Sequence, residues 1–104
     1  MIMTYENLKE TVFDGRPVVL KCGADFCQPC KVMDKTLDRL QPEYKDVEFV
    51  HVDVGEEQEL AQELGVTNVP VTFFISADGE IVNRKVGLLP EKAIIAEIEN
   101  LLNT

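Results

Sequence analysis

The chain has 104 residues, of which 45% are hydrophobic and 28% are charged, a balance that predicts one globular domain over residues 1–104. Its formal net charge is −9 at pH 7, and its basic residues are not clustered, which argues against binding to nucleic acid or to anionic membranes. The N-terminal stretch lacks a signal-peptide pattern, and no apolar run approaches the roughly 18 residues of a membrane span, so we expect a cytoplasmic protein.

Hydrophobic periodicity predicts alternating helices and strands. In chain order, we expect a helix over 5–13, a strand over 16–22, a helix from 28 that ends or bends at Pro42, a strand over 46–54, a helix over 56–65, strands over 69–76 and 81–87, and a helix over 90–103. The expected inward faces of the second and last helices are Met33, Leu37, Leu40 and Tyr44, and Ile94, Ile95, Ile98, Leu101 and Leu102.

This order of elements predicts an α/β fold. The Asp78-Gly79 pair favours a tight turn between the last two strands, and Gly65 is typical of a helix C-cap. Alternation followed by a terminal hairpin implies a mixed sheet with helices on both faces. Right-handed crossovers then place the turn after residue 22 at the carboxyl end of its strand, where sites in α/β folds usually lie.

Two of the three cysteines stand three positions apart at that turn, in the segment C-Q-P-C. Cys27 is expected at the start of a helix and Cys30 one turn inside it. A helix N-terminus carries unpaired N–H groups and a partial positive charge, which stabilise a thiolate, and Lys31 adds positive charge nearby. Residues three apart on a helix share a face at a separation that a disulfide can span, so the pair suits thiol–disulfide exchange.

Other interpretations of the cysteines remain open at this point. A C-x-x-C pair can be half of a zinc site, although the other candidate ligands, Cys22 and His51, are isolated in the sequence. A chance pair of core cysteines is a further alternative. We expect Cys22 to be a small buried hydrophobe and His51 to be a strand residue with a satisfied ring rather than a ligand.

The chain resembles the thioredoxin family over nearly its whole length. Four segments with the family's spacing carry the resemblance: ADFCQPCK at 24–31, VDV at 52–54, TNVPVTFFI at 67–75 and KVGLLP at 85–90. The resemblance implies a thioredoxin fold with a central four- or five-stranded mixed sheet, whose first strand would be residues 1–4 or lost. It also implies that the Cys27 thiolate attacks a substrate disulfide and that Cys30 resolves the mixed disulfide. The residues implied to bind substrate are Phe26, Gln28, Pro29, Val69, Gly87 and Pro70, the last as a cis-proline.

Several positions depart from the family pattern. Gln28 replaces the usual glycine between the cysteines, Phe26 replaces the usual tryptophan, and Lys35 stands where the family has a kinking proline. The largest departure is Lys21, because the family usually has a buried aspartate there that helps to deprotonate the resolving thiol. We therefore expect one of two outcomes for Lys21: its ammonium approaches Cys30 and stabilises the thiolate, or it extends to solvent without a catalytic part. His51 stands where the family often has a lysine.

We therefore expect a protein-disulfide reductase that acts by thiol–disulfide exchange. No bound cofactor or metal is needed, since the cysteines carry the electrons. By resemblance, its partners are disulfide-containing protein substrates and a thioredoxin reductase or similar electron donor, and we expect a monomer. Two alternatives are a redox-inactive binding module with the same fold, and a zinc or iron–sulfur protein that uses Cys27 and Cys30.

Overall fold

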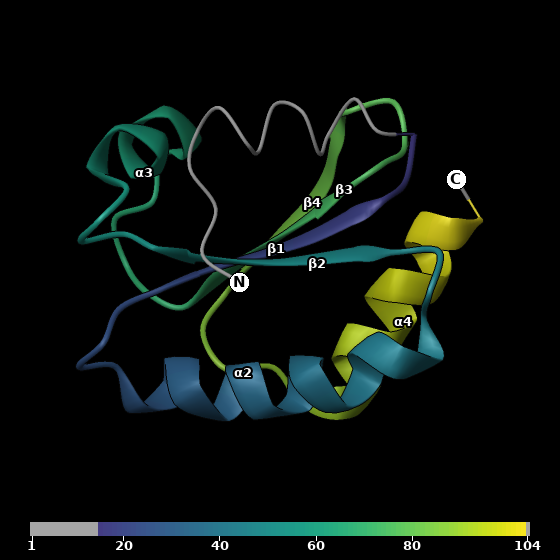
Figure 1. The fold of residues 1–104 in the computed structure, drawn as a ribbon, viewed down its shortest axis with the longest axis horizontal. Coiled ribbons are helices and arrows are strands. Elements are labelled where there is room, and N and C mark those ends of the chain that lie inside the picture. The colour runs from purple at the N-terminus through teal and green to yellow at the C-terminus, as the bar shows by residue number, and fades with distance from the viewer. Residues whose placement is uncertain (1–14, 104) are drawn as a thin grey trace.

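The computed structural model describes residues 15–103, which contain a four-stranded mixed sheet in the order β2-β1-β3-β4 (Figure 1). Strand β1 runs parallel to β2 and antiparallel to β3, and β3 runs antiparallel to β4. The strand bounds are β1 (Val18–Gly23), β2 (Glu48–Asp53), β3 (Val71–Ile75) and β4 (Ile81–Val86). The predicted mixed sheet is confirmed, and the expected helix over 5–13 and strand over 1–4 lie outside the described residues.

Helices cover both faces of the sheet, as Figure 1 shows. Helices α2 (Gln28–Leu40) and α4 (Glu91–Leu102) lie on one face, and α3 (Gln58–Leu64) lies on the other. Each face has its own apolar core. Because side chains alternate along a strand, β1 sends Val18, Leu20 and Cys22 into the core with α3, while Val19 packs in the core with α2 and α4.

Alternation also decides where the polar residues of the central strands lie. Lys21 has the same parity as Val19, and in the neighbouring strand His51 has the same parity as Phe49, which packs in the α2 core. Lys21 pairs in register with His51 of β2 and with Thr72 of β3. Three polar side chains therefore form a row on the face of the sheet that carries α2.

Several predicted boundaries shift in the structure. The helix that starts at Gln28 ends at Leu40, and Pro42 lies in a short 3₁₀ turn, η1 (Gln41–Glu43), so Tyr44 falls beyond the helix. A proline ring clashes with the carbonyl four residues earlier, which explains the change of helix type. Leu102 is 39% exposed, so its expected place on the inward face of α4 is wrong.

The predicted turns are confirmed. Gly65 caps α3 with a φ of 70°, a left-handed conformation that glycine adopts without steric penalty. Asp78 and Gly79 form the turn between β3 and β4, with a φ of 90° at Gly79. The Gly79 amide donates a hydrogen bond to the Ser76 carbonyl at 2.9 Å. This turn brings β4 back beside β3, where it forms one edge strand of the sheet.

Candidate active site

The C-Q-P-C segment joins the carboxyl end of β1 to the first turn of α2. After β1 ends at Gly23, the Cys27 amide donates to the Ala24 carbonyl at 3.2 Å and closes a tight turn. Cys27 is the N-cap of α2, and its Sγ accepts a hydrogen bond from the Cys30 amide at 3.2 Å. Pro29 occupies the first turn, where its missing N–H breaks no helical hydrogen bond.

The two cysteines form a disulfide, with their Cα atoms 5.2 Å apart. Their surroundings differ, because Cys27 is 8% exposed and Cys30 is 1% exposed. As the N-cap, Cys27 lies where the unpaired N–H groups and the helix dipole favour a negative sulfur. Cys30 faces inward, toward the row of polar residues on the sheet. The pair therefore presents one sulfur near the surface and one toward the interior.

Exposed side chains surround the outer cysteine. Phe26, which the family resemblance implies to bind substrate, is 89% exposed. Gln28 and Pro29 are exposed in the first turn of α2, and Lys31 is exposed one residue after Cys30. A large aromatic ring that is almost fully in solvent gains nothing from the core, so its apolar surface is available to a partner.

The peptide bond between Val69 and Pro70 is cis, as the family resemblance implies. Strand β3 begins directly after it, and Val71 pairs with Cys22 near the end of β1. Pro70 therefore lies at the same end of the sheet as the cysteine turn. The Gly87 amide donates to the Pro70 carbonyl at 2.8 Å, and Gly87 has a φ of 94°. The fold thus brings together three segments that are far apart in sequence.

Lys21 does not extend to solvent, so the orientation expected in the second of its two outcomes is wrong. Its side chain is 5% exposed, and its Nζ lies 2.5 Å from Asp34 Oδ1 on α2. A Cβ built on Gly23 would be 2.8 Å from Lys21 Nζ and 3.1 Å from Cys30 Sγ. Nζ and Sγ are therefore at most about 5.9 Å apart. A charge shifts the pKa of a neighbouring group over separations of up to ~4–6 Å.

Asp34 is the site residue that sequence reasoning missed. It pairs with Lys21 and also lies 3.1 Å, by its Oδ1, from His51 Nδ1. The available signal was its spacing, because residue 34 is four positions after Cys30 and shares its side of α2. Position alone did not predict the pairing, since the partners come from strands whose register the tertiary fold decides.

The expectation of a satisfied ring at His51 is wrong for one of its nitrogens. Nδ1 is close to Asp34 Oδ1 but buried without an aligned hydrogen bond, and Nε2 lies 3.4 Å from Asp38 Oδ1. Burial lowers the pKa of His51 below 6.5; Asp34 opposes that shift and the Lys21 charge adds to it. The imidazole is therefore held mainly in its neutral form near neutral pH.

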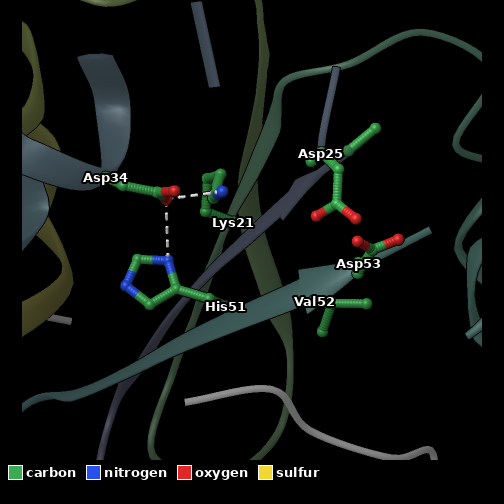
Figure 2. Close-up of a pocket in the computed structure, with 8 residues that line it drawn as sticks. Lys21, Asp25, Asp34, His51, Val52 and Asp53 are labelled. Carbon is green, nitrogen blue, oxygen red and sulfur yellow. Dashed lines mark ion pairs between the residues drawn. The ribbon is translucent and has the colours of Figure 1, made fainter. Parts of the chain in front are cut away.

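A shallow pocket of about 150 Å³ opens beside this group of charges (Figure 2). Lys21, Asp34 and His51 lie at one end of it, and Asp25 and Asp53 approach each other at the other end. Most of the side chains that line the pocket are charged or titratable, and the backbone that follows β1, at Gly23 and Ala24, forms part of its wall.

Cys22 has no part in this site. It is fully buried in the core on the α3 side of the sheet, and burial raises the pKa of its thiol to about 12. The expectation of a small buried hydrophobe is confirmed. Within residues 15–103, no group of three or more His, Cys, Asp or Glu side chains is placed to hold a metal ion.

No helix in that part of the chain combines the length and the apolar character needed to cross a bilayer.

Two disulfide-bonded cysteines, three positions apart at the start of a helix, lie at the same end of the sheet as a cis-proline. This site defines the protein as a thiol–disulfide oxidoreductase of the protein-disulfide reductase class. The family model for thioredoxin matches residues 1–100, and the chain belongs to the thioredoxin family. A thioredoxin of Aspergillus fumigatus is 42% identical over 96 residues, covering 86% of each chain. The structure is similar to that of Fasciola hepatica thioredoxin, with a TM-score of 0.87, 31% identity and 94% of each chain covered.

The oxidised form of mitochondrial thioredoxin 3 from Saccharomyces cerevisiae is also similar, with a TM-score of 0.86 and 28% identity. The match covers 96% of this chain and 92% of that one. The predicted family, fold and class of enzyme are thereby confirmed.

Proposed function

We propose that Cys27 is the attacking cysteine and Cys30 the resolving cysteine of a protein-disulfide reductase. The observation that carries this assignment is the difference between the two sulfurs. Cys27 is the more exposed one and lies at the N-cap, where a thiolate is stabilised, whereas Cys30 is 1% exposed and faces the interior. A bulky substrate can reach only the outer sulfur.

The reaction consists of two exchanges. The Cys27 thiolate attacks one sulfur of a substrate disulfide, forms a mixed disulfide and releases the other substrate sulfur as a thiolate, which takes a proton from water. Cys30 then loses its proton to solvent and attacks Cys27 Sγ. The Cys27–Cys30 bond forms while the bond to the substrate breaks, so the substrate gains two electrons and the protein is oxidised.

Lys21 has a part in the second exchange. Its Nζ is buried and lies 2.8 Å from the position that a Cβ would take at Gly23, while Cys30 Sγ lies 3.1 Å from the same position. The developing thiolate therefore meets a positive charge in a poorly hydrated place. In the family a buried aspartate stands at this position, and here a cation stabilises the thiolate instead. Lys31 is exposed, and its charge acts on the cysteine turn through solvent.

The substrate segment binds across the outer end of the sheet. The exposed Phe26 forms one wall, beside Gln28 and Pro29, and Val69, Pro70 and Gly87 form the opposite wall. Extended peptides commonly bind through the backbone of a segment that is not fully paired, which is the contribution proposed for Val69.

The oxidised protein is reduced again by a thioredoxin reductase or a similar donor. We propose that it works in the cytoplasm as a monomer and as a step in electron transport, with residues 1–104 forming one domain. The net charge of −9 supports a dispersed protein that is not attracted to nucleic acid or to anionic membranes.

Two variants test the assignment of the cysteines. Cys30→Ser should accumulate a stable mixed disulfide and release less substrate, because the resolving thiol is missing. Cys27→Ser should form no mixed disulfide under the same conditions. The unaltered chain should reduce insulin with dithiothreitol as the electron source. A correctly folded chain without this activity would favour the binding module, and stoichiometric zinc or iron in purified protein would favour the metal site.

A further inference from the structure

Three titratable side chains meet beneath the first turns of α2, and we call them the Lys21 cluster: Lys21 from β1, Asp34 from α2 and His51 from β2. One oxygen, Asp34 Oδ1, lies 2.5 Å from Lys21 Nζ and 3.1 Å from His51 Nδ1 (Figure 2). A single carboxylate oxygen therefore faces two basic groups. The contacts are ionic rather than aligned hydrogen bonds, because Oδ1 and Nδ1 both lack hydrogen-bond geometry.

The backbone holds this cluster in place from three sides. Lys21 and His51 are paired in register on neighbouring parallel strands, and both point toward α2. Asp34 comes from the same helix as Cys30, one turn further on. Lys21 Nζ and Cys30 Sγ lie 2.8 Å and 3.1 Å from the position that a Cβ would take at Gly23. The cluster thus reaches from a partly exposed imidazole to the interior sulfur.

We propose that Asp34 is a positioning residue for the resolving step: its carboxylate is divided between Lys21 and His51, and this division sets how readily the Cys30 thiol ionises. The inference rests on the resolving role proposed for Cys30 and extends it to residues that do not touch the sulfur. Asp34 acts through Lys21, which is the charge nearest to Cys30.

The sign of the effect follows from the charges. With His51 neutral, Asp34 and Lys21 cancel much of each other's field at Cys30. With a cation at residue 51, the cluster carries a net positive charge, and a thiolate at Cys30 is stabilised. Removal of the Asp34 charge should also stabilise the thiolate, because it leaves the Lys21 ammonium to pair with the Cys30 sulfur. Both changes should make the thiolate form at lower pH.

Among residues 15–103, the other charged side chains that line the pocket or approach His51 are acidic. Asp38 approaches His51 Nε2 from α2, one turn beyond Asp34, and Asp25 and Asp53 line the far end of the same pocket. Thr72, the neighbour of Lys21 on β3, is uncharged. These carboxylates favour a protonated His51, but none of them contacts Lys21, so Asp34 is the group that couples the two sides.

The test measures thiolate formation rather than turnover. In the Cys27→Ser background, Cys30 is the thiol whose ionisation is followed, because burial raises the pKa of Cys22 to about 12. Thiolate absorbance is followed against pH. Adding Asp34→Asn should move thiolate formation to lower pH, with about tenfold more thiolate at a fixed pH below the midpoint. Asp34→Glu should stay close to the parent chain.

Asp38→Asn is the matched control. It removes a carboxylate charge from the same helix, next to the other ring nitrogen of His51, and leaves the Lys21–Asp34 pair in place. It should leave thiolate formation at Cys30 nearly unchanged. No shift on Asp34→Asn, a shift to higher pH, or an equal shift on Asp38→Asn would overturn the proposal.

A second comparison keeps Asp34 in place. His51→Lys puts a permanent cation at residue 51 and His51→Gln a neutral amide, so their difference reports how charge at this position reaches Cys30. The Lys variant should form the Cys30 thiolate at lower pH than the Gln variant, and coincident curves would contradict the proposal. Insulin reduction is measured separately in the chain that retains both active-site cysteines. Absence of insulin reduction would contradict the resolving role proposed for Cys30. Coincident thiolate curves in a chain that reduces insulin would contradict the coupling alone.

Discussion

The buried ammonium of Lys21 can be removed with little change of shape by Lys21→Met. The side chain is 5% exposed, and methionine fills the same channel between β1 and α2 without the charge. Asp34, which the substitution leaves without its partner, still has access to solvent and keeps its contact with His51. The main consequence should therefore be electrostatic.

The contacts around Gly23 set the size of the effect. Lys21 Nζ and Cys30 Sγ lie 2.8 Å and 3.1 Å from one Cβ position, so they are at most about 5.9 Å apart. At that separation and an effective dielectric constant of ~20, two unit charges interact by about 3 kcal/mol. Loss of that attraction would lower the thiolate fraction about a hundredfold. Relaxation and water in the pocket reduce this, and we expect at least about tenfold.

The assay is the thiolate absorbance of Cys30 in the Cys27→Ser background, followed against pH. Lys21→Met should move thiolate formation to higher pH and, in the chain with both cysteines, should slow release of substrate from the mixed disulfide. Lys35→Met removes a charge of the same sign from an exposed position of α2 and serves as the control. An unchanged thiolate curve in a folded Lys21→Met chain would refute the electrostatic part assigned to this residue.

Four further predictions concern other parts of the molecule. Gly23→Ala adds a methyl group 3.1 Å from both Cβ and Sγ of Cys30 and 2.8 Å from the buried Lys21 Nζ. Urea unfolding should therefore show a loss of about 1–3 kcal/mol, and an unchanged midpoint would contradict the packing. Burial lowers the pKa of His51 below 6.5, so the unfolded chain binds this proton more tightly; the stability from His51 is full above pH ~6.5 and is lost as pH falls through the lower folded value. Unfolding curves of His51→Gln should lack that contribution, and an equal acid loss in both chains would argue against it. Cys22→Ser buries a hydroxyl in the core and should cost about 1–3 kcal/mol of stability with turnover unaltered; a loss of turnover at equal folding would give Cys22 a redox role. Phe26→Ala should leave the unfolding free energy unchanged, because the ring is 89% exposed, but should raise KM for protein substrates; an unaltered KM would remove Phe26 from the binding wall.

Local signals predicted most of the elements and their order. Alternating valines in the strands, the spacing of Met33 and Leu37 in α2, and the glycine after α3 each depend on a few neighbouring residues, and the structure confirms them. The boundaries were predicted to within a few residues, as the end of α2 at Leu40, shortly before Pro42, shows. Whether a helix continues past such a point depends on what its last turn packs against.

The cysteine pair could be found from the sequence because its chemistry requires neighbours in the chain. A disulfide between residues three apart and a helix start are both local, so Cys27 and Cys30 were identified together with their places at the start of the helix and one turn inside it. The cis bond before Pro70 came from family resemblance, since local sequence preference favours the trans form.

The charges that surround the interior sulfur were decided by the tertiary structure alone. Lys21, Asp34 and His51 are each ordinary residues of a strand or a helix, and nothing in their local sequence announces that one carboxylate will face two bases. The parallel register of β1 and β2 and the seating of α2 across them bring the three together. Electrostatic coupling depends on distance through space, and only the folded chain sets that distance.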